Sequence, residues 1–186
     1  MAVILASASP RRKELLGFIV PDFTVRVSDA EEITDPALSA EETVMALACI
    51  KGDAVASDFP EDTVISADTV VVLDGKILGK PKSRDEAYSM LSSLSGRSHT
   101  VYTGVCISFN GRRICFAEAT TVNFAALTDS EINSYIDSGE PFDKAGGYGI
   151  QGIGCFLVTS INGDYYNVMG LPVARLYREL KDNSLI

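Results

Sequence analysis

The sequence predicts an α/β fold: an elongated, twisted mixed β-sheet flanked by helices, with two lobes around a central cleft. Strand and helix patterns alternate along the chain, an order typical of helices packed on a sheet. Tight turns at Asp74-Gly75 and Asn110-Gly111 predict hairpins, so antiparallel pairs should join strands that crossover helices connect in parallel. We expect one domain over residues 1–186, a length that can bury a substantial core.

Helices are predicted where a polar N-cap residue precedes an apolar stripe. Three capping-box patterns, each with a glutamate three residues on, predict helix starts: Ser39 for 40–56, Ser83 for 84–95 and Thr128 for 129–138. Gly96 and Gly139 are expected to end the second and third of these helices. A last helix is expected to begin near Pro172.

Strands are predicted where apolar residues run together or alternate with polar ones. The predicted strands are 3–5, 23–27, 63–73, 76–78, 100–109, 112–124 and 155–161. A glycine-rich segment, 143–152, should connect a helix to the last of them. The order of these elements requires both hairpins and crossovers, which is why a mixed sheet is expected.

Composition excludes several classes of protein. The net charge of −9 argues against a general nucleic-acid or anionic-membrane binder, so an anionic substrate must meet a local basic cluster. No apolar run approaches the roughly 20 residues that span a bilayer, and the N-terminal run is too short for a signal peptide. The four cysteines form no C-x-x-C pair and predict a reduced, cytoplasmic protein with cysteines in its core. With one histidine, a zinc site of Cys and His ligands is not expected, and carboxylates should hold any Mg²⁺ or Mn²⁺.

The chain passes from strand 3–5 into a helix through Ser9 and Pro10, which suit the N-cap and first helical position. The first turn then carries Arg11 and Arg12, although the helix dipole disfavours cations there. Two cations and free backbone N–H groups at one helix start predict a bound anion, most simply a phosphate. The alternative is a surface helix start with two solvated arginines.

Two charged residues stand where apolar ones are expected. Asp68 interrupts the apolar strand 63–73, and a buried carboxylate needs a cation, a metal or a chemical role. Lys51 lies on the apolar stripe of helix 40–56, so it either reaches the edge of the core or points into a polar cleft. A structural ion pair is the alternative for Asp68; a general base or metal ligand is the functional interpretation.

Three further features are weaker signals. Lys80 and Lys82 flank a proline in a loop that is either basic by function or simply solvated. The glycines of 143–152 either bring backbone N–H groups to a ligand or form a tight connection, and Gln151 there offers a donor and an acceptor. His99 is expected to be structural, because no paired nucleophile is evident.

Long motifs in order resemble the Maf family of nucleoside triphosphate pyrophosphatases. They are LASASPRRKELL, SADTVV, GKP, LSGRSHTVYTGV, EINSYIDSGEPFDKAGGYGIQG and INGDYYNVMGLP. The resemblance covers residues 3 to about 176. It implies a cytoplasmic enzyme, often a homodimer, that cuts a nucleoside triphosphate into a monophosphate and pyrophosphate with a divalent cation. It also implies a fold related to the inosine triphosphate pyrophosphatases.

The same resemblance assigns roles to single residues. It implies that Asp68 is the base, and that Arg11, Thr69 and Gln151 set the specificity for dTTP and UTP. The remaining substrate-binding positions that it implies are Ser7, Arg12, Glu31, Lys51 and Lys80, with Glu31 and Asp68 as metal ligands. If Arg12 and Lys51 serve the substrate, replacing either by alanine should barely change stability.

Rival functions remain open on the sequence. A sister branch of the family acts on 7-methyl-GTP and has a glutamate in place of Gln151. A phosphatase with an aspartate nucleophile would release phosphate, but such enzymes usually show Asp-x-Asp near the first strand, and Asp68 stands alone. The third possible function is a non-catalytic nucleotide-binding regulator of septum formation. Metal-dependent turnover of a nucleotide would favour the enzyme over such a regulator.

Overall fold

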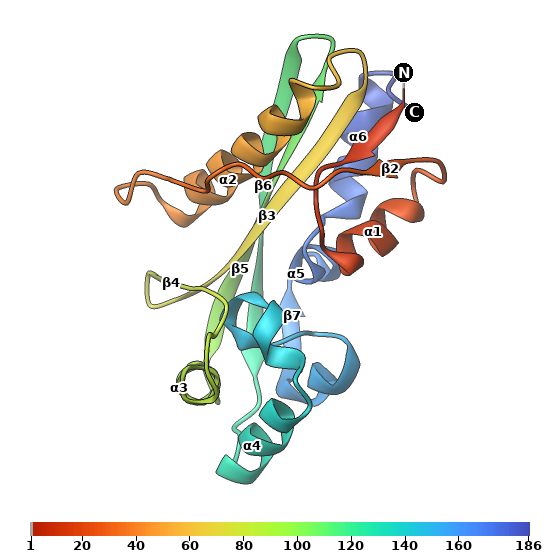
Figure 1. Cartoon of the computed structure of the whole chain (residues 1–186). Helices are drawn as coiled ribbons and strands as arrows, with labels where there is room; N and C mark the ends of the chain where they lie inside the picture. Colours follow the sequence, from red (N-terminus) through yellow and green to blue (C-terminus); the bar gives the residue numbers. More distant parts are fainter. Residues whose placement is uncertain (1) are drawn as a thin grey trace. The chain divides into compact units, whose positions relative to one another are not determined.

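The computed structural model describes residues 2–186 (Figure 1). Its strands are β1 Val3–Leu5, β2 Thr24–Val25, β3 Thr63–Leu73, β4 Lys76–Leu78, β5 Ser98–Phe109, β6 Arg112–Phe124 and β7 Val158–Asn162. Its α-helices are α1 Pro10–Gly17, α2 Ala40–Ala56, α3 Arg84–Leu94, α4 Asp129–Asp137, α5 Tyr165–Met169 and α6 Val173–Asp182. Short 3-10 turns, η1 Glu140–Asp143, η2 Ala145–Gly147 and η3 Gly152–Leu157, carry the glycine-rich segment.

The strands form one mixed sheet in the order β2-β1-β3-β5-β6-β7, with β4 paired to β3. β1 is parallel to both β2 and β3, whereas β4 is antiparallel to β3 and β7 is antiparallel to β6. Helical connections join the parallel strands, and the turn between β3 and β4 is a hairpin. The predicted α/β class with a mixed sheet flanked by helices is therefore confirmed.

The chain divides into two compact units. The first unit holds the residues up to Thr69, then Thr103–Glu118 and Gly170–Ile186; the second holds Val70–Tyr102 and Ala119–Met169. Each unit has its own buried cluster: Ile4, Ala6, Val55 and Val64 in the first, and a larger one around Leu91, Leu94, Tyr135 and Leu157 in the second. In the first unit, α2 lies on one side of the strands, and α1 and α6 lie on the other (Figure 1). That residues 1–186 act as a single domain stays a prediction.

The capping patterns located the helices well. Ser39 and Thr128 form complete capping boxes, and α2 and α4 begin at the next residue. The third box is only half formed. Ser83 accepts the N–H of Glu86 at 3.1 Å, but the Glu86 carboxylate accepts the N–H of Lys82 at 2.7 Å instead of turning back to Ser83. The expectation of a capping box there was wrong, although the helix begins where predicted.

Two strand predictions were too long. Strand 23–27 shrinks to the two exposed residues of β2, which pair with Ile4 and Leu5. On its C-terminal side the pairing stops after Val25 because β1 ends at Leu5. Strand 155–161 begins only at Val158, after the turn η3. The Glu140 carboxylate accepts the N–H groups of Ile153 at 3.0 Å and Gly154 at 3.4 Å, so the chain winds around this side chain before it can join β6.

None of the helices in residues 2–186 is both long enough and apolar enough to cross a membrane.

Candidate active site

The turn between β1 and α1 has the predicted geometry. Ser9 is the N-cap and Pro10 the first helical residue, and the Ser9 hydroxyl oxygen accepts the N–H of Arg12 at 3.4 Å. Ser7 is buried, and its hydroxyl oxygen accepts the N–H of Ser9 at 3.3 Å. The first turn of α1 contains no acidic residue, so the positive end of the helix dipole stays available to an anion.

The Arg12 guanidinium is held by the protein itself. Nε donates to the Gly170 carbonyl at 2.8 Å, and Nη1 donates to the Ala67 carbonyl at 2.8 Å and to the Ser7 hydroxyl at 3.2 Å. Nη2 donates to the Thr69 hydroxyl at 3.0 Å. Burial lowers the pKa of Arg12, and the nearby Asp68 carboxylate opposes that shift. Four of the five N–H groups of a guanidinium are thus used to join α1, β3 and the start of the C-terminal segment.

These contacts change what Arg12→Ala should do. From the sequence, stability was expected to change little if Arg12 served the substrate, but the side chain donates to two backbone carbonyls and two hydroxyls. Removing it would leave buried acceptors without donors, which costs free energy. A substantial loss of stability is now the expected result.

Thr69 is the second residue that this network positions. Its hydroxyl receives the Arg12 hydrogen bond and also forms a 2.9 Å hydrogen bond with the hydroxyl of Thr103 on β5. The Thr69 side chain is therefore oriented from two sides, as a residue that reads a ligand must be.

Asp68 and Lys51, predicted separately, meet in the structure. Lys51 Nζ on α2 lies 2.6 Å from Asp68 Oδ1 on β3, and both side chains are mostly buried. The Glu32 carboxylate approaches the same ammonium, at 3.1 Å from Oε2 to Nζ. Lys51 therefore points from the apolar stripe of α2 into a polar group of two carboxylates. Asp68 Oδ2 has no hydrogen-bond partner among residues 2–186.

Glu32 is a site residue to which the sequence assigned no role: Glu31 and Glu32 both stood as loop carboxylates of uncertain role. Glu31 was chosen through the family resemblance, and in the structure it lies exposed in the loop before α2, while its neighbour Glu32 contacts Lys51. Two adjacent glutamates in a loop carry no periodicity that tells them apart. The role of Glu31 stays a prediction.

In the second unit, the glycine-rich segment packs against the loop of Lys80. The N–H of Gly146 donates to the Gly79 carbonyl at 2.9 Å, and a Cβ at Gly146, where φ is +69°, would lie 2.9 Å from Val71. The tight-connection interpretation thus holds for this glycine. Lys80 is exposed, and Gln151 is half-buried. The Gln151 amide oxygen Oε1 is buried and has no hydrogen-bond partner among residues 2–186, so it is an acceptor that still needs a donor.

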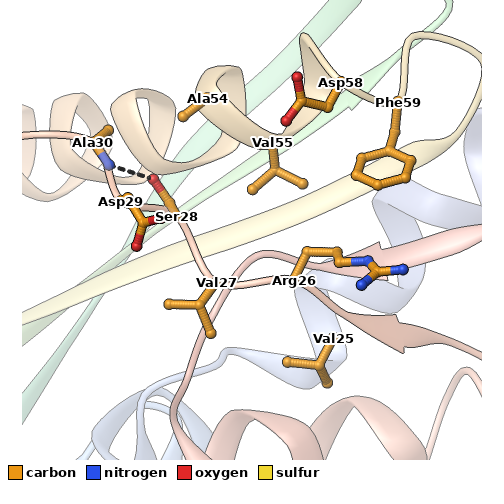
Figure 2. A pocket seen from close by; sticks show the side chains of 10 residues that line it. All are labelled: Val25, Arg26, Val27, Ser28, Asp29, Ala30, Ala54, Val55, Asp58 and Phe59. Carbon is orange, nitrogen blue, oxygen red and sulfur yellow. Dashed lines mark hydrogen bonds between the residues drawn. The ribbon is translucent and has the colours of Figure 1, made fainter.

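A pocket of about 580 Å³ lies elsewhere in the first unit (Figure 2). It is lined by residues 25–30 on one side and by Ala54, Val55, Asp58 and Phe59 on the other. Sequence reasoning did not find it, and it contains none of the predicted site residues. The pocket carries Arg26, Ser28, Asp29 and Asp58 on its walls, and it does not include the paired Lys51 and Asp68 side chains.

The fold places the chain among α/β proteins with the fold of the Staphylococcus aureus Ham1 protein. That structure matches with a TM-score of 0.60 over 98% of this chain and 100% of its own, at 16% identity, so the likeness concerns the fold alone. The chain belongs to the Maf family: the Maf-like protein model matches residues 2–183. The resemblance stated from the motifs is confirmed.

Relatives with assigned names are similar over nearly their whole length. A dTTP/UTP pyrophosphatase of Bacillus cereus is 51% identical over 96% of this chain and 94% of its own. One from Bacillus cytotoxicus is 53% identical over 96% and 93%, and one from Carboxydothermus hydrogenoformans is 51% identical over 98% of each chain.

Proposed function

We propose that this protein is a nucleoside triphosphate pyrophosphatase that hydrolyses dTTP and UTP to the monophosphate and pyrophosphate. Relatives about half identical over nearly all of both chains carry that name. The structural observation that carries the proposal is the group formed by Glu32, Lys51 and Asp68. It combines a cation for phosphate with a carboxylate for water, and phosphoryl chemistry needs chiefly positioning and charge stabilisation.

The carboxylates also suit a divalent cation. Maf-type pyrophosphatases are generally metal-dependent hydrolases. Glu32 and Asp68 converge on one positive charge, the Lys51 ammonium, so two hard oxygen ligands already face a common point. Carboxylates together with substrate phosphates are the usual ligands of Mg²⁺ and Mn²⁺. We therefore propose Asp68 as a ligand, with Glu31 or Glu32 beside it. When bound, the metal neutralises phosphate charge and lowers the pKa of water.

The side chains have separable roles in the proposed reaction. The N-terminus of α1 and the Ser7 hydroxyl donate hydrogen bonds to phosphate oxygens, and Lys51 and Lys80 neutralise charge. Arg12 positions Ser7 and Thr69. Asp68 accepts a proton from the attacking water at Oδ2, because Oδ1 is bound to Lys51.

Gln151 suits a uracil or thymine base. These bases present an N3–H donor flanked by carbonyl acceptors. The buried Gln151 Oε1 can accept from N3–H, and the Gln151 NH₂ group can donate to the adjacent carbonyl. Arg11 and Thr69 share the discrimination in this proposal.

The test of the catalytic role is Asp68→Asn, assayed with dTTP and saturating Mg²⁺. We expect kcat to fall about 10²–10⁴-fold, the usual contribution of a general base, with unchanged or higher stability because Lys51 keeps Glu32 as a partner. The matched control is Asp53→Asn on α2, which removes a carboxylate that pairs with Arg113 at the surface. Near-normal kcat in the Asp68 variant would show that Asp68 is neither base nor essential ligand.

A further inference from the structure

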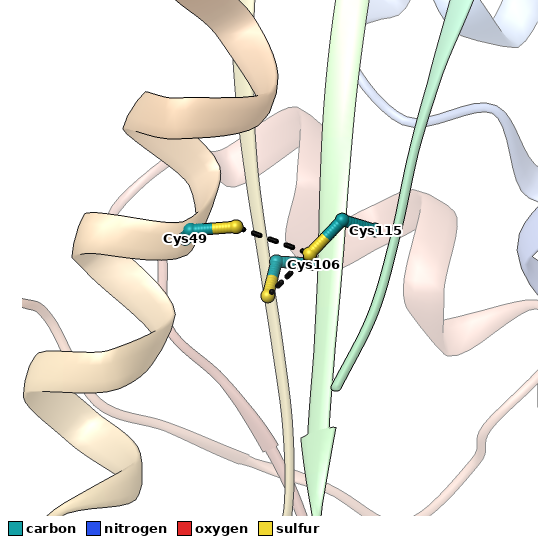
Figure 3. Close-up of side chains that lie close together, drawn as sticks. All are labelled: Cys49, Cys106 and Cys115. Carbon is teal, nitrogen blue, oxygen red and sulfur yellow. Dashed lines mark hydrogen bonds between the residues drawn. The ribbon is translucent and has the colours of Figure 1, made fainter. Parts of the chain in front are cut away.

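Three of the four cysteines gather at one point of the first unit, although they are far apart in the sequence. Cys49 comes from α2, Cys106 from β5 and Cys115 from β6 (Figure 3). Cys115 Sγ lies 3.1 Å from Cys49 Sγ and 3.4 Å from Cys106 Sγ. All three sulfurs lie within 4.8 Å of one another, and all three cysteines are free thiols. We call this group the cysteine cluster.

The fold determines the cluster in two ways. Asn110 and Gly111 form a two-residue turn, both with positive φ, and Cys106 and Cys115 lie four residues from it on either side, so they face each other across the hairpin. Helix α2 then packs closely on this face. At Gly104, a Cβ would lie 2.4 Å from the Val44 carbonyl of α2, so the backbones are in contact about one and a half turns before Cys49.

The cluster resembles a ligand set rather than an ordinary part of a core. Within the cluster, Cys106 is fully buried, Cys49 is half-buried and Cys115 is exposed. The expectation that the cysteines are core residues was therefore wrong for Cys115. An ion in solution could thus reach the sulfurs without unfolding of the chain. No His, Asp or Glu atom belongs to the group within residues 2–186, so the donor set is three sulfurs.

We propose that the cysteine cluster binds one monovalent copper ion through the three sulfurs. Soft thiolates select Cu(I) or zinc; zinc would need a fourth ligand taken from solvent, whereas three sulfurs complete a trigonal Cu(I) site. A metal–sulfur bond of about 2.3 Å in a trigonal site sets the sulfurs about 4.0 Å apart. The observed separations of 3.1 and 3.4 Å would each need to open by less than about 1 Å, within the reach of side-chain rotation.

This site is separate from the proposed catalytic group. Cys49 and Lys51 are two residues apart on α2, and successive residues turn by 100° about a helix, so the two side chains leave it about 200° apart. The inference concerns copper binding and does not depend on the proposed pyrophosphatase activity.

The test is an anaerobic titration of the reduced full chain with Cu(I) against a coloured Cu(I) chelator. We expect one copper per chain and a thiolate-to-copper charge-transfer band in the ultraviolet. Cys49→Ser and Cys115→Ser should each weaken binding roughly a hundredfold or more, because loss of a direct ligand costs at least as much as loss of its outer-shell support. Both residues are at least partly accessible, so both variants should fold, which circular dichroism would verify.

The matched control is Cys155→Ser, which removes the exposed cysteine of the second unit and should leave copper binding unchanged. Three results would overturn the proposal: binding no tighter than in the Cys49/Cys115 double variant, equal loss in the Cys155 variant, or tighter binding of Zn²⁺ than of Cu(I). Conversion of two thiols to a disulfide by hydrogen peroxide, without any copper binding by the reduced chain, would also overturn it.

Discussion

Arg12→Ala should destabilise the fold far more than a change at an ordinary helix start. The guanidinium joins α1 to β3 and to the Gly170 carbonyl, 158 residues away. Alanine removes all four hydrogen bonds at once and leaves the Ala67 and Gly170 carbonyls to find other donors.

The magnitude follows from those contacts. A buried acceptor left without a partner costs about 1–3 kcal/mol, and water entering the space of the lost side chain recovers part of that cost. With two carbonyls affected, we expect a loss of about 3 kcal/mol. A chain of 186 residues loses about 2–4 °C in Tm for each kcal/mol, so Tm should fall by about 6–12 °C.

Differential scanning fluorimetry and urea unfolding would measure this loss. Lys13→Ala is the matched control, because it removes an exposed cation from the next position of the same helix. It should shift Tm by less than about 2 °C. If Arg12→Ala behaved like the control in stability while KM for dTTP rose tenfold, the guanidinium would be serving the substrate, and the positioning role would be refuted.

Four other predictions concern single side chains. Burial lowers the pKa of His99 to about 4 from its ordinary 6.5, so between those pH values the unfolded chain binds a proton that the folded chain does not. The free energy of unfolding should therefore fall by roughly 3 kcal/mol as pH drops from 7.5 to 4. Urea unfolding of His99→Gln should lack this part of the loss. Gln151→Glu should lower kcat/KM for dTTP and UTP about tenfold or more, because an ionised carboxylate cannot donate a hydrogen bond. The kcat/KM for 7-methyl-GTP should fall less, or rise. Equal losses on all three triphosphates would mean that Gln151 does not read the base. Lys51→Ala should weaken triphosphate binding or transition-state stabilisation by about 1.5–3 kcal/mol in steady-state kinetics, and unchanged kinetics with a large loss of stability would make it structural. A hydrogen bond from Cys106 lowers the pKa of Cys49 to about 5, whereas desolvation raises the pKa of Cys115 to about 11. Mass spectrometry should therefore find Cys49 alkylated first at pH 7. Faster labelling of Cys115 would contradict this prediction.

Local chemistry explains which elements could be predicted from the sequence. Ser39 and Thr128 cap their helices through atoms three residues away, and β3 is a continuous apolar run, so each is determined within a short window. The lengths of strands 23–27 and 155–161 could not be predicted locally, because they depend on distant parts of the chain. These are the short strand β1 for the first and the Glu140 carboxylate for the second.

The site shows the same division. Asp68 and Lys51 could be singled out because each breaks an apolar pattern, but their 2.6 Å pairing required the tertiary structure. Glu32 has no such pattern. The cysteine cluster was invisible for a similar reason: nothing in the spacing of Cys49, Cys106 and Cys115 indicates that a helix and a hairpin bring their sulfurs together.

The products released from dTTP test the central claim most directly. Purified protein would be incubated with dTTP and Mg²⁺, and the products separated by anion exchange and counted over time. A pyrophosphatase must release dTMP and pyrophosphate in equal amounts, with no dTDP, and Asp68→Asn must abolish nearly all of this turnover. Release of inorganic phosphate with dTDP would identify a phosphatase, and the absence of turnover with either Mg²⁺ or Mn²⁺ would identify a nucleotide-binding protein; either result would contradict the proposed function.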